Sequence, residues 1–141
     1  MNINILEAMK HRYPFLLIDK VLAHDYLKST KVIKYVSYNE PWVQGHYPEN
    51  PIFPGVLMIE AMGQASGLML IDFAGENDIN KYGYLVKVEN CKFVRPVFPG
   101  SKLVMNCKML EKIDDRYIKV QVIATVDDKK VATSILVFML K

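Results

Sequence analysis

The chain has 141 residues, of which 51% are hydrophobic, and this size and composition suit one domain with a single packed core spanning residues 1–141. Its 18 basic residues barely outnumber its 15 acidic ones, and they are mostly Lys scattered along the chain, which argues against nucleic-acid binding. The first residues carry no secretory signal, so we expect a cytoplasmic protein.

The longest apolar stretch, residues 56–74, does not have the pattern of a membrane span. It is interrupted by Glu60, Gln64 and Asp72 and has no Lys or Arg at either end. Cys91 and Cys107 lack a C-x-x-C spacing and a neighbouring His. We therefore predict two buried thiols and no metal site.

The first third of the chain gives a mixed pattern. We predict a short helix over residues 4–10, a strand-like run over 14–22 and a second strand over 30–38. Residues 45–55, GHYPENPIFPG, then contain three prolines, each of which fixes φ and removes a backbone donor. No regular helix or central strand is expected to pass through this segment.

The next segment, residues 56–74, contains strong helix formers and no proline, which predicts a helix of about five turns. Its apolar residues cover nearly every face. A helix of this kind has to be enclosed by the rest of the protein.

The second half of the chain predicts the enclosing sheet. Apolar residues alternate with polar ones in two runs: Leu103, Met105, Cys107 and Met109, then Ile118, Val120, Val122, Ala124 and Val126. Turns are expected at Pro99-Gly100, Asp114-Asp115 and Asp127-Asp128. The last run, residues 131–140, is apolar on both faces, so we expect a partner subunit to cover its second side. Together these elements predict an α+β fold with an antiparallel sheet wrapped around one long helix.

Glu60 is the first candidate for chemistry, because it stands one turn into this apolar helix. Its nearest polar neighbour on the same face is Gln64, four residues on, and no Lys or Arg is placed to neutralise it. One interpretation is a carboxylate at an exposed helix edge. The other is a carboxyl group adapted for proton transfer in a cleft.

His46 is the second candidate. It lies in the rigid proline-rich segment, and such rigidity is what positioning an imidazole for catalysis requires. His11 and His24 have no comparable setting and are interpreted as structural or solvent-exposed. Gly55 opens the helix with free backbone N–H groups, which could bind a carbonyl oxygen that gains negative charge. A base, an acid and an oxyanion site thus fall within residues 45–60.

Three segments carry a family resemblance: HRYPFLLIDKV at residues 11–21, GHYPENPIFPGVLMIEAMGQ at 45–64 and FVRPVFPG at 93–100. In this order they resemble the bacterial (3R)-hydroxyacyl-ACP dehydratases of the hot-dog fold, known as FabZ. The central motif is specific, since it combines a His, a proline-rich loop, PGV and a Glu fourteen positions after the His.

The resemblance implies a role for each matching residue. His46 would remove a proton from C2 of a 3-hydroxyacyl thioester, and Glu60 would protonate the departing C3 hydroxyl to leave a trans-2-enoyl thioester. The Gly55 amide would polarise the thioester carbonyl and Gln64 would support the acid. The resemblance also assigns substrate contacts to Phe53, Pro54 and Val56.

The resemblance further implies partners and a quaternary state. The substrate would be carried as a 3-hydroxyacyl-phosphopantetheine on an acyl carrier protein, and no metal or organic cofactor is implied. We expect a homodimer, arranged as a trimer of dimers, in which His46 of one subunit meets Glu60 of the other.

Two departures from the family pattern stand out: Glu49-Asn50 where Gly-His is common, and Lys87 with Glu89 where small or apolar residues and an Asp are more usual. Three alternatives remain open. The chain could also isomerise the enoyl product, could be an acyl thioesterase on the same fold, or could be a non-catalytic acyl-binding module.

Overall fold

A computed structural model gives the structure of the protein and describes residues 2–75 and 81–141. Within these residues the helices are α1 (Ile5–Ala8), α2 (Trp42–Gly45) and α3 (Gly55–Gly67), and a 3-10 turn follows at Leu68–Leu70. The strands are β1 (Lys20–Asp25), β2 (Ser29–Tyr35), β3 (Gly83–Phe93), β4 (Lys102–Ile113), β5 (Tyr117–Val126) and β6 (Lys129–Leu140).

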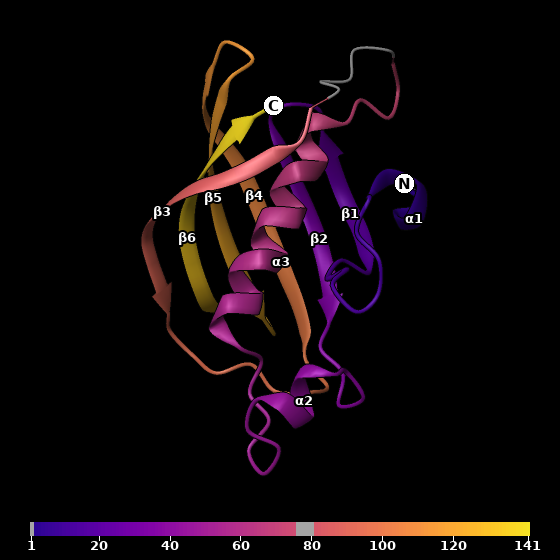
Figure 1. Cartoon of the computed structure of the whole chain (residues 1–141), viewed down its shortest axis with the longest axis vertical. Coiled ribbons are helices and arrows are strands. Elements are labelled where there is room, and N and C mark those ends of the chain that lie inside the picture. Colours follow the sequence, from indigo (N-terminus) through magenta and orange to yellow (C-terminus); the bar gives the residue numbers. More distant parts are fainter. Residues whose placement is uncertain (1, 76–80) are drawn as a thin grey trace.

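The strands form one antiparallel sheet in the order β1-β2-β4-β5-β6-β3. The sheet curves around α3, which lies across its concave face and contacts β2, β4, β5 and β3 (Figure 1). This confirms the predicted α+β architecture of a sheet wrapped around one central helix.

The alternation in the strands explains how the core forms. Leu103, Met105 and Cys107 of β4 are buried, whereas Lys102, Asn106 and Lys108 on the opposite face of the strand are exposed. The predicted turns also occur. Between β5 and β6, Asp127 and Asp128 adopt φ values of 51° and 63°, the left-handed pair that a two-residue type I′ hairpin requires and that Asp tolerates.

The central helix is shorter than the predicted five turns. It ends at Gly67, passes through the 3-10 turn and gives way to extended backbone at Ile71. The carbonyls of the 3-10 turn find partners outside the helix: His24 Nε2 lies 2.8 Å from the Leu68 oxygen, and Leu27 N donates to the Met69 oxygen. These tertiary bonds replace the i→i−4 bonds of a further helical turn.

The prediction that this helix is enclosed on all sides is also only partly right. Met58, Ala61, Met62 and Ala65 are buried against the sheet, but Val56 in the first turn is 76% exposed. The sheet therefore covers one face of α3 and leaves its N-terminal end open within the single chain.

The predicted strand over residues 14–22 was wrong in its first half. β1 begins only at Lys20, because the backbone before it bonds elsewhere: Phe15 N and Leu16 N donate to the Arg12 carbonyl, and Leu17 N donates to Gln64 Oε1. Leu17 is nonetheless buried in the core. The segment packs like a core element without being a strand.

The remaining boundaries differ by smaller amounts. The predicted helix at 4–10 shrinks to α1, whose N-cap Asn4 accepts backbone N–H groups through its side chain. The predicted strand at 30–38 becomes β2 and ends at Tyr35. The prolines keep residues 46–54 out of helices and strands, as predicted, but the short helix α2 just before them was not foreseen.

The two cysteines differ. Cys107 is buried, and its burial raises the pKa of the thiol to about 12, so it behaves as the inert core residue expected. The prediction was wrong for Cys91, which is only half-buried. Cys91 lies on the outermost strand β3, next to Asn90, whose φ of 50° accompanies a break in the register with β6.

No helix among the described residues is long and apolar enough to cross a membrane.

A buried ion pair fixes the chain between β2 and α2. Lys34 is 5% exposed, and its Nζ donates to Glu40 Oε1 at 2.7 Å. The other carboxylate oxygen of Glu40 accepts Ser37 N at 2.7 Å. Glu40 thus joins the end of the sheet to the segment that leads into α2 and His46.

We predict that Glu40→Gln lowers the free energy of unfolding by about 3 kcal/mol, because it leaves the Lys34 cation buried without its counter-charge. Urea denaturation measures the change. Adding Lys34→Met to Glu40→Gln removes the uncompensated charge and should restore most of the loss. A single variant as stable as the parent would show that the pair contributes nothing.

Candidate active site

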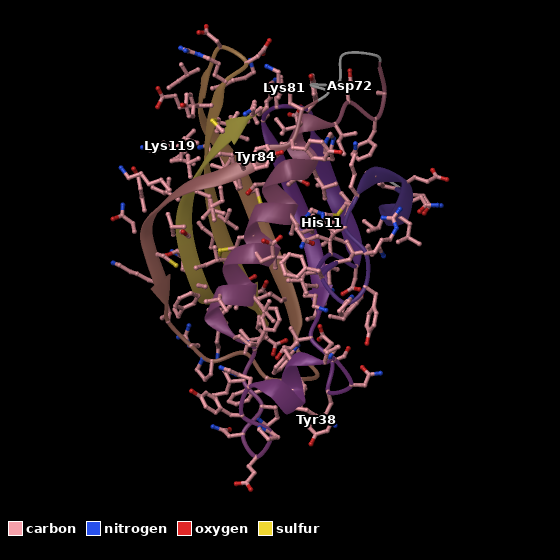
Figure 2. All side chains as sticks on the ribbon, in the orientation of Figure 1. His11, Tyr38, Asp72, Lys81, Tyr84 and Lys119 are labelled. Atoms are coloured by element: carbon pink, nitrogen blue, oxygen red, sulfur yellow. The ribbon has the colours of Figure 1, made fainter. Side chains whose placement is uncertain are left out.

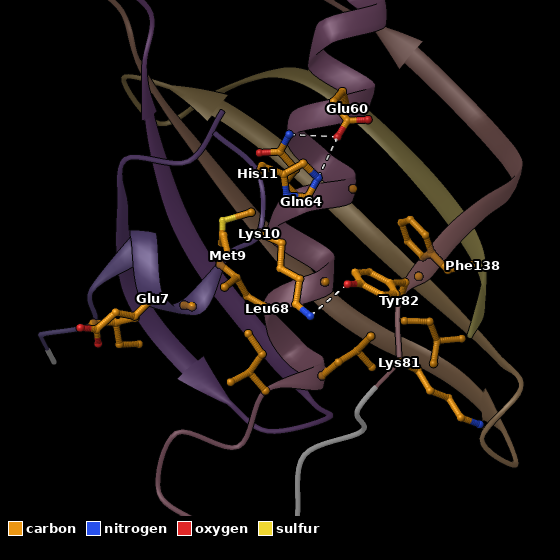
Figure 3. A pocket seen from close by; sticks show the side chains of 18 of the residues that line it. Glu7, Met9, Lys10, His11, Glu60, Gln64, Leu68, Lys81, Tyr82 and Phe138 are labelled. Carbon is orange, nitrogen blue, oxygen red and sulfur yellow. Dashed lines mark hydrogen bonds and ion pairs between the residues drawn. The ribbon is translucent and has the colours of Figure 1, made fainter. Parts of the chain in front are cut away.

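Glu60 lies in the second turn of α3, with its side chain about one-third exposed. Its Oε2 atom accepts a hydrogen bond from Gln64 Nε2 at 2.9 Å and lies 3.8 Å from His11 Nε2 (Figure 3). Oε1 makes no hydrogen bond to any of the described residues. The predicted proton-transfer carboxyl is therefore held by one oxygen and free at the other.

Gln64 is 4% exposed, and every polar atom of its carboxamide is used. Its Oε1 accepts Leu17 N at 2.8 Å, and its Nε2 donates to the Phe15 carbonyl at 2.7 Å as well as to Glu60. Because a carboxamide oxygen only accepts and its nitrogen only donates, these contacts allow one orientation of the group. The backbone before β1 thus orients Gln64, and Gln64 orients Glu60.

A groove of about 900 Å³ runs beside these residues, between α3, the N-terminal segment and the start of β3. Glu60, Gln64 and His11 line one part of it, and Leu68 and Phe138 add apolar surface. Toward the other end, Lys10 Nζ donates to the Tyr82 hydroxyl at 3.1 Å (Figure 3). The groove combines a largely apolar lining with the carboxyl groups of Glu7, Glu60 and Asp72, and an apolar lining of this length suits a ligand with an acyl chain.

His46 follows α2 directly, and its backbone N–H donates to the Trp42 carbonyl at 2.8 Å. Its ring atom Nδ1 lies 3.0 Å from the Ile52 carbonyl oxygen. Because that oxygen can only accept, the contact assigns the proton to Nδ1 and leaves the lone pair on Nε2. His46 therefore has the tautomer of a base that acts through Nε2.

The proline-rich loop that carries His46 is anchored on the core. Phe53 is buried, packs edge-to-face on Trp42 at a ring-centroid distance of 5.6 Å, and donates its backbone N–H to the Val97 carbonyl at 2.8 Å. Pro54 is buried as well. In the single chain Phe53 and Pro54 support the loop. Neither residue is among the described residues that line the groove.

Gly55 opens α3 after Pro54, and no side chain caps this end of the helix. The first intrahelical bond runs from Met58 N to Pro54 O, so the amides of Gly55, Val56 and Leu57 precede the hydrogen-bonded helix. A Cβ at Gly55 would lie 3.0 Å from the Phe93 ring of β3. The lack of a side chain here lets β3 approach the helix end closely.

The structure brings some of the predicted site residues together and keeps others apart. Glu60 and Gln64 meet in the groove, whereas His46, Gly55 and Val56 do not line it in the single chain. His24 is structural, as expected, since it bonds to Leu68 and packs on Phe73.

His11, also interpreted as structural or solvent-exposed, instead stands at Glu60. Figure 2 shows it beside the middle of α3, away from the lower end of the molecule where Tyr38 lies. Sequence reasoning missed this placement. The signal that could have found it is the position of His11 at the start of the first family segment.

The two departures from the family pattern lie away from Glu60. Glu49 and Asn50 occupy an exposed turn after His46. Lys87, on the same strand β3, lies 3.0 Å from a carboxylate oxygen of Glu89, and Lys119 on β5 lies 3.1 Å from the other oxygen. The hydrogen bonds from Lys87 and then Lys119 hold the pKa of Glu89 below its usual value. The substitution on β3 thus forms a charge cluster on the sheet surface.

Among residues 2–75 and 81–141, no group of three or more His, Cys, Asp or Glu side chains is arranged to hold a metal ion.

The fold resembles that of a known dehydratase assembly. The chain superimposes on a chain of the dehydratase heterocomplex ApeI:P from Xenorhabdus doucetiae with a TM-score of 0.80, at 16% sequence identity, covering 100% of this chain and 93% of that one. At this identity the likeness concerns the fold alone. An antiparallel sheet that curves around a long central helix, together with this likeness, defines the class as a hot-dog fold protein.

The sequence comparisons define the family. Residues 9–134 match the model of the FabA-like domain. The chain is 42% identical over 135 residues to the 3-hydroxyacyl-(acyl-carrier-protein) dehydratase FabZ of Tolumonas auensis, covering 93% of this chain and 88% of that protein. It is 40% identical over 138 residues to the protein of the same name from Buchnera aphidicola, covering 98% and 90%. The chain belongs to the FabZ family of FabA-like proteins, as the motifs predicted.

We predict that Gln64→Leu lowers the free energy of unfolding by about 2–4 kcal/mol, because it strips Leu17 N and the Phe15 carbonyl of a partner in a buried site. Ser66→Ala is the matched control. Ser66 is also buried on α3, but its hydroxyl donates to Met62 within the helix, so its loss should cost under about 1 kcal/mol. Equal losses in the two variants, measured by urea denaturation, would contradict the special role of Gln64.

Proposed function

We propose that the protein is a hydro-lyase that dehydrates (3R)-hydroxyacyl-acyl carrier protein to trans-2-enoyl-acyl carrier protein in fatty-acid biosynthesis. Membership of the FabZ family supports this reaction and substrate. The observation that carries the chemistry is the Glu60 carboxyl, which Gln64 fixes at the edge of an apolar groove large enough for an acyl chain.

In the proposed mechanism His46 is the base and Glu60 the acid. Nε2 of His46 takes the weakly acidic C2 proton, while an amide at Gly55 stabilises the negative charge that develops on the thioester oxygen. Glu60 gives its proton to the C3 hydroxyl, the C3–O bond breaks, and water leaves as the C2–C3 double bond forms. The proton on His46 must afterwards return to Glu60, through solvent, to reset the site.

The remaining proposed roles are matters of binding. We propose that Val56, in the exposed first turn of α3, contacts the substrate. The buried Phe53 and Pro54 are proposed to shape the substrate-binding surface beside Val56. The paired His46 favours dehydration over thioester hydrolysis, because a thioesterase needs only a carboxylate to activate water.

We predict that His46→Ala and Glu60→Gln each lower kcat for dehydration by at least about 100-fold, since a positioned acid or base contributes that much. Absorbance of the enoyl thioester follows the reaction, and circular dichroism verifies that each variant is folded. A folded variant with near-normal turnover would remove its residue from the mechanism.

We further propose a homodimer in which His46 of one chain meets Glu60 of the other. Within one chain these residues belong to different surfaces, since Glu60 lines the groove and His46 does not. Among the described residues, the edge strand β3 pairs with β6 and no other strand, and it exposes Tyr84, Leu85, Val86 and Val88. An unpaired edge with exposed apolar side chains favours association with a second copy.

Subunit mixing tests this arrangement. If inactive His46→Ala and Glu60→Gln chains are unfolded, mixed equally and refolded, random pairing makes about half the dimers hetero, and each heterodimer has one intact site. About a quarter of the parental activity should therefore return. Activity that stays at the level of the single variants, with heterodimers verified by native mass spectrometry, would mean that one chain supplies both residues.

The acyl carrier protein is the proposed partner, the cytoplasm the proposed location and a trimer of dimers the proposed assembly. The formal net charge of +3 is compatible with attraction of an acidic carrier. The trimer of dimers is the assembly that the family resemblance implies.

We predict that raising ionic strength increases KM for the acyl carrier protein substrate more than KM for a short pantetheine thioester, because surface charge acts on association and is screened by salt. Steady-state kinetics from about 50 to 300 mM salt, across which the Debye length falls by about half, measure both. Equal responses would count against electrostatic docking of the carrier.

A further inference from the structure

The two carboxylate oxygens of Glu60 have different neighbours. Gln64 donates to Oε2 at 2.9 Å, and His11 Nε2 approaches the same oxygen to 3.8 Å. Oε1 has no such neighbour within the described chain, and it is the oxygen left free for a substrate. Two side chains from different parts of the sequence thus converge on one atom.

The ring of His11 is built into the N-terminal segment. It stacks on Phe15 with a centroid distance of 6.4 Å and an interplanar angle of 23°. Arg12 Nη1 donates to the His11 carbonyl at 2.7 Å and also to the Met9 carbonyl at 2.8 Å. The backbone beside the ring is therefore braced, and Figure 3 shows the imidazole directed at Glu60.

The two ring nitrogens of His11 lie in different surroundings. Nδ1 is buried and has no partner among the described residues, while the side chain as a whole is 39% exposed and its Nε2 lies 3.8 Å from Glu60 Oε2. Because the Glu60 carboxyl oxygen accepts, a proton on Nε2 directs an N–H dipole at Glu60 Oε2.

We infer that His11 is a positioning residue for the reaction: together with Gln64 it holds Oε2 of Glu60, so that Oε1 faces the substrate. This inference rests on the proposed function. The separation of 3.8 Å is longer than a hydrogen bond and closes to one by a movement of about 1 Å. Catalytic contacts commonly tighten in this way when substrate binds.

Replacing His11 by Phe tests the inference, because Phe keeps the stack on Phe15, fills the buried side of the ring and removes only the nitrogens. We expect kcat for dehydration to fall by at least about 10-fold with KM within about twofold, since misplacing a reacting group by 1 Å can cost more than this. His11→Gln, whose amide nitrogen can reach the place of Nε2, should recover most of kcat. His24→Phe makes the same change at a histidine outside the groove, and kcat should be unaffected.

A double-mutant cycle separates positioning from a general structural effect. If His11 acts through Glu60, then His11→Phe costs almost nothing further in a Glu60→Gln background, because the group it positions is gone. A structural role would instead multiply the two losses. Circular dichroism and the midpoint of urea unfolding establish that each protein is folded.

The outcomes also separate this inference from the proposed function. A kcat of His11→Phe within about threefold of the parent, or a loss that multiplies with that of Glu60→Gln, overturns the role of His11 and leaves the acid assignment standing. If Glu60→Gln itself turns over normally, the assignment of Glu60 as the acid fails, and the role of His11 fails with it. If the parent protein does not dehydrate the substrate, the proposed function is wrong.

Discussion

The orientation of the Gln64 carboxamide is the constraint on which the candidate site depends. A buried carboxamide needs a donor for its oxygen and acceptors for its two N–H groups. Here Leu17 N donates to the Gln64 oxygen, and the Phe15 carbonyl accepts from the Gln64 nitrogen. One remaining interaction is directed at Glu60. The same bonds prevent the chain at residues 15–17 from forming a strand, so a local loss of regular structure orients the carboxyl group.

The other half of the candidate site is held by a separate set of bonds. Glu40 links the end of β2 to the approach to α2, and the contact with the Ile52 carbonyl sets the tautomer of His46. Phe53 then ties the loop to the segment that follows β3. The contacts that hold Glu60 and those that hold His46 share no residue. A single chain can therefore fix the acid and the base without placing them in one groove.

The edge strand β3 connects the site with assembly. It contacts α3 through Phe93 at Gly55, where any side chain would crowd the ring, and it exposes apolar residues on its free edge. A second copy paired at this edge would approach the exposed first turn of α3. The charge cluster around Glu89 occupies the same strand, so the departure at Lys87 and Glu89 alters the surface of the strand and leaves the acid untouched.

The sequence alone determined the alternation that builds β4 and β5, the turns that flank them, the irregular loop of residues 46–54 and the candidate roles of His46 and Glu60, because period, proline and motif spacing are local properties. It did not determine where α3 ends, why residues 14–19 are not a strand, or that Cys91 is only half-buried. Nor did it place His11 at Glu60. Each of these depends on hydrogen-bond partners or cover supplied by residues distant in the sequence, such as Gln64 for Leu17 and His24 for Leu68. Only the folded chain brings those partners together.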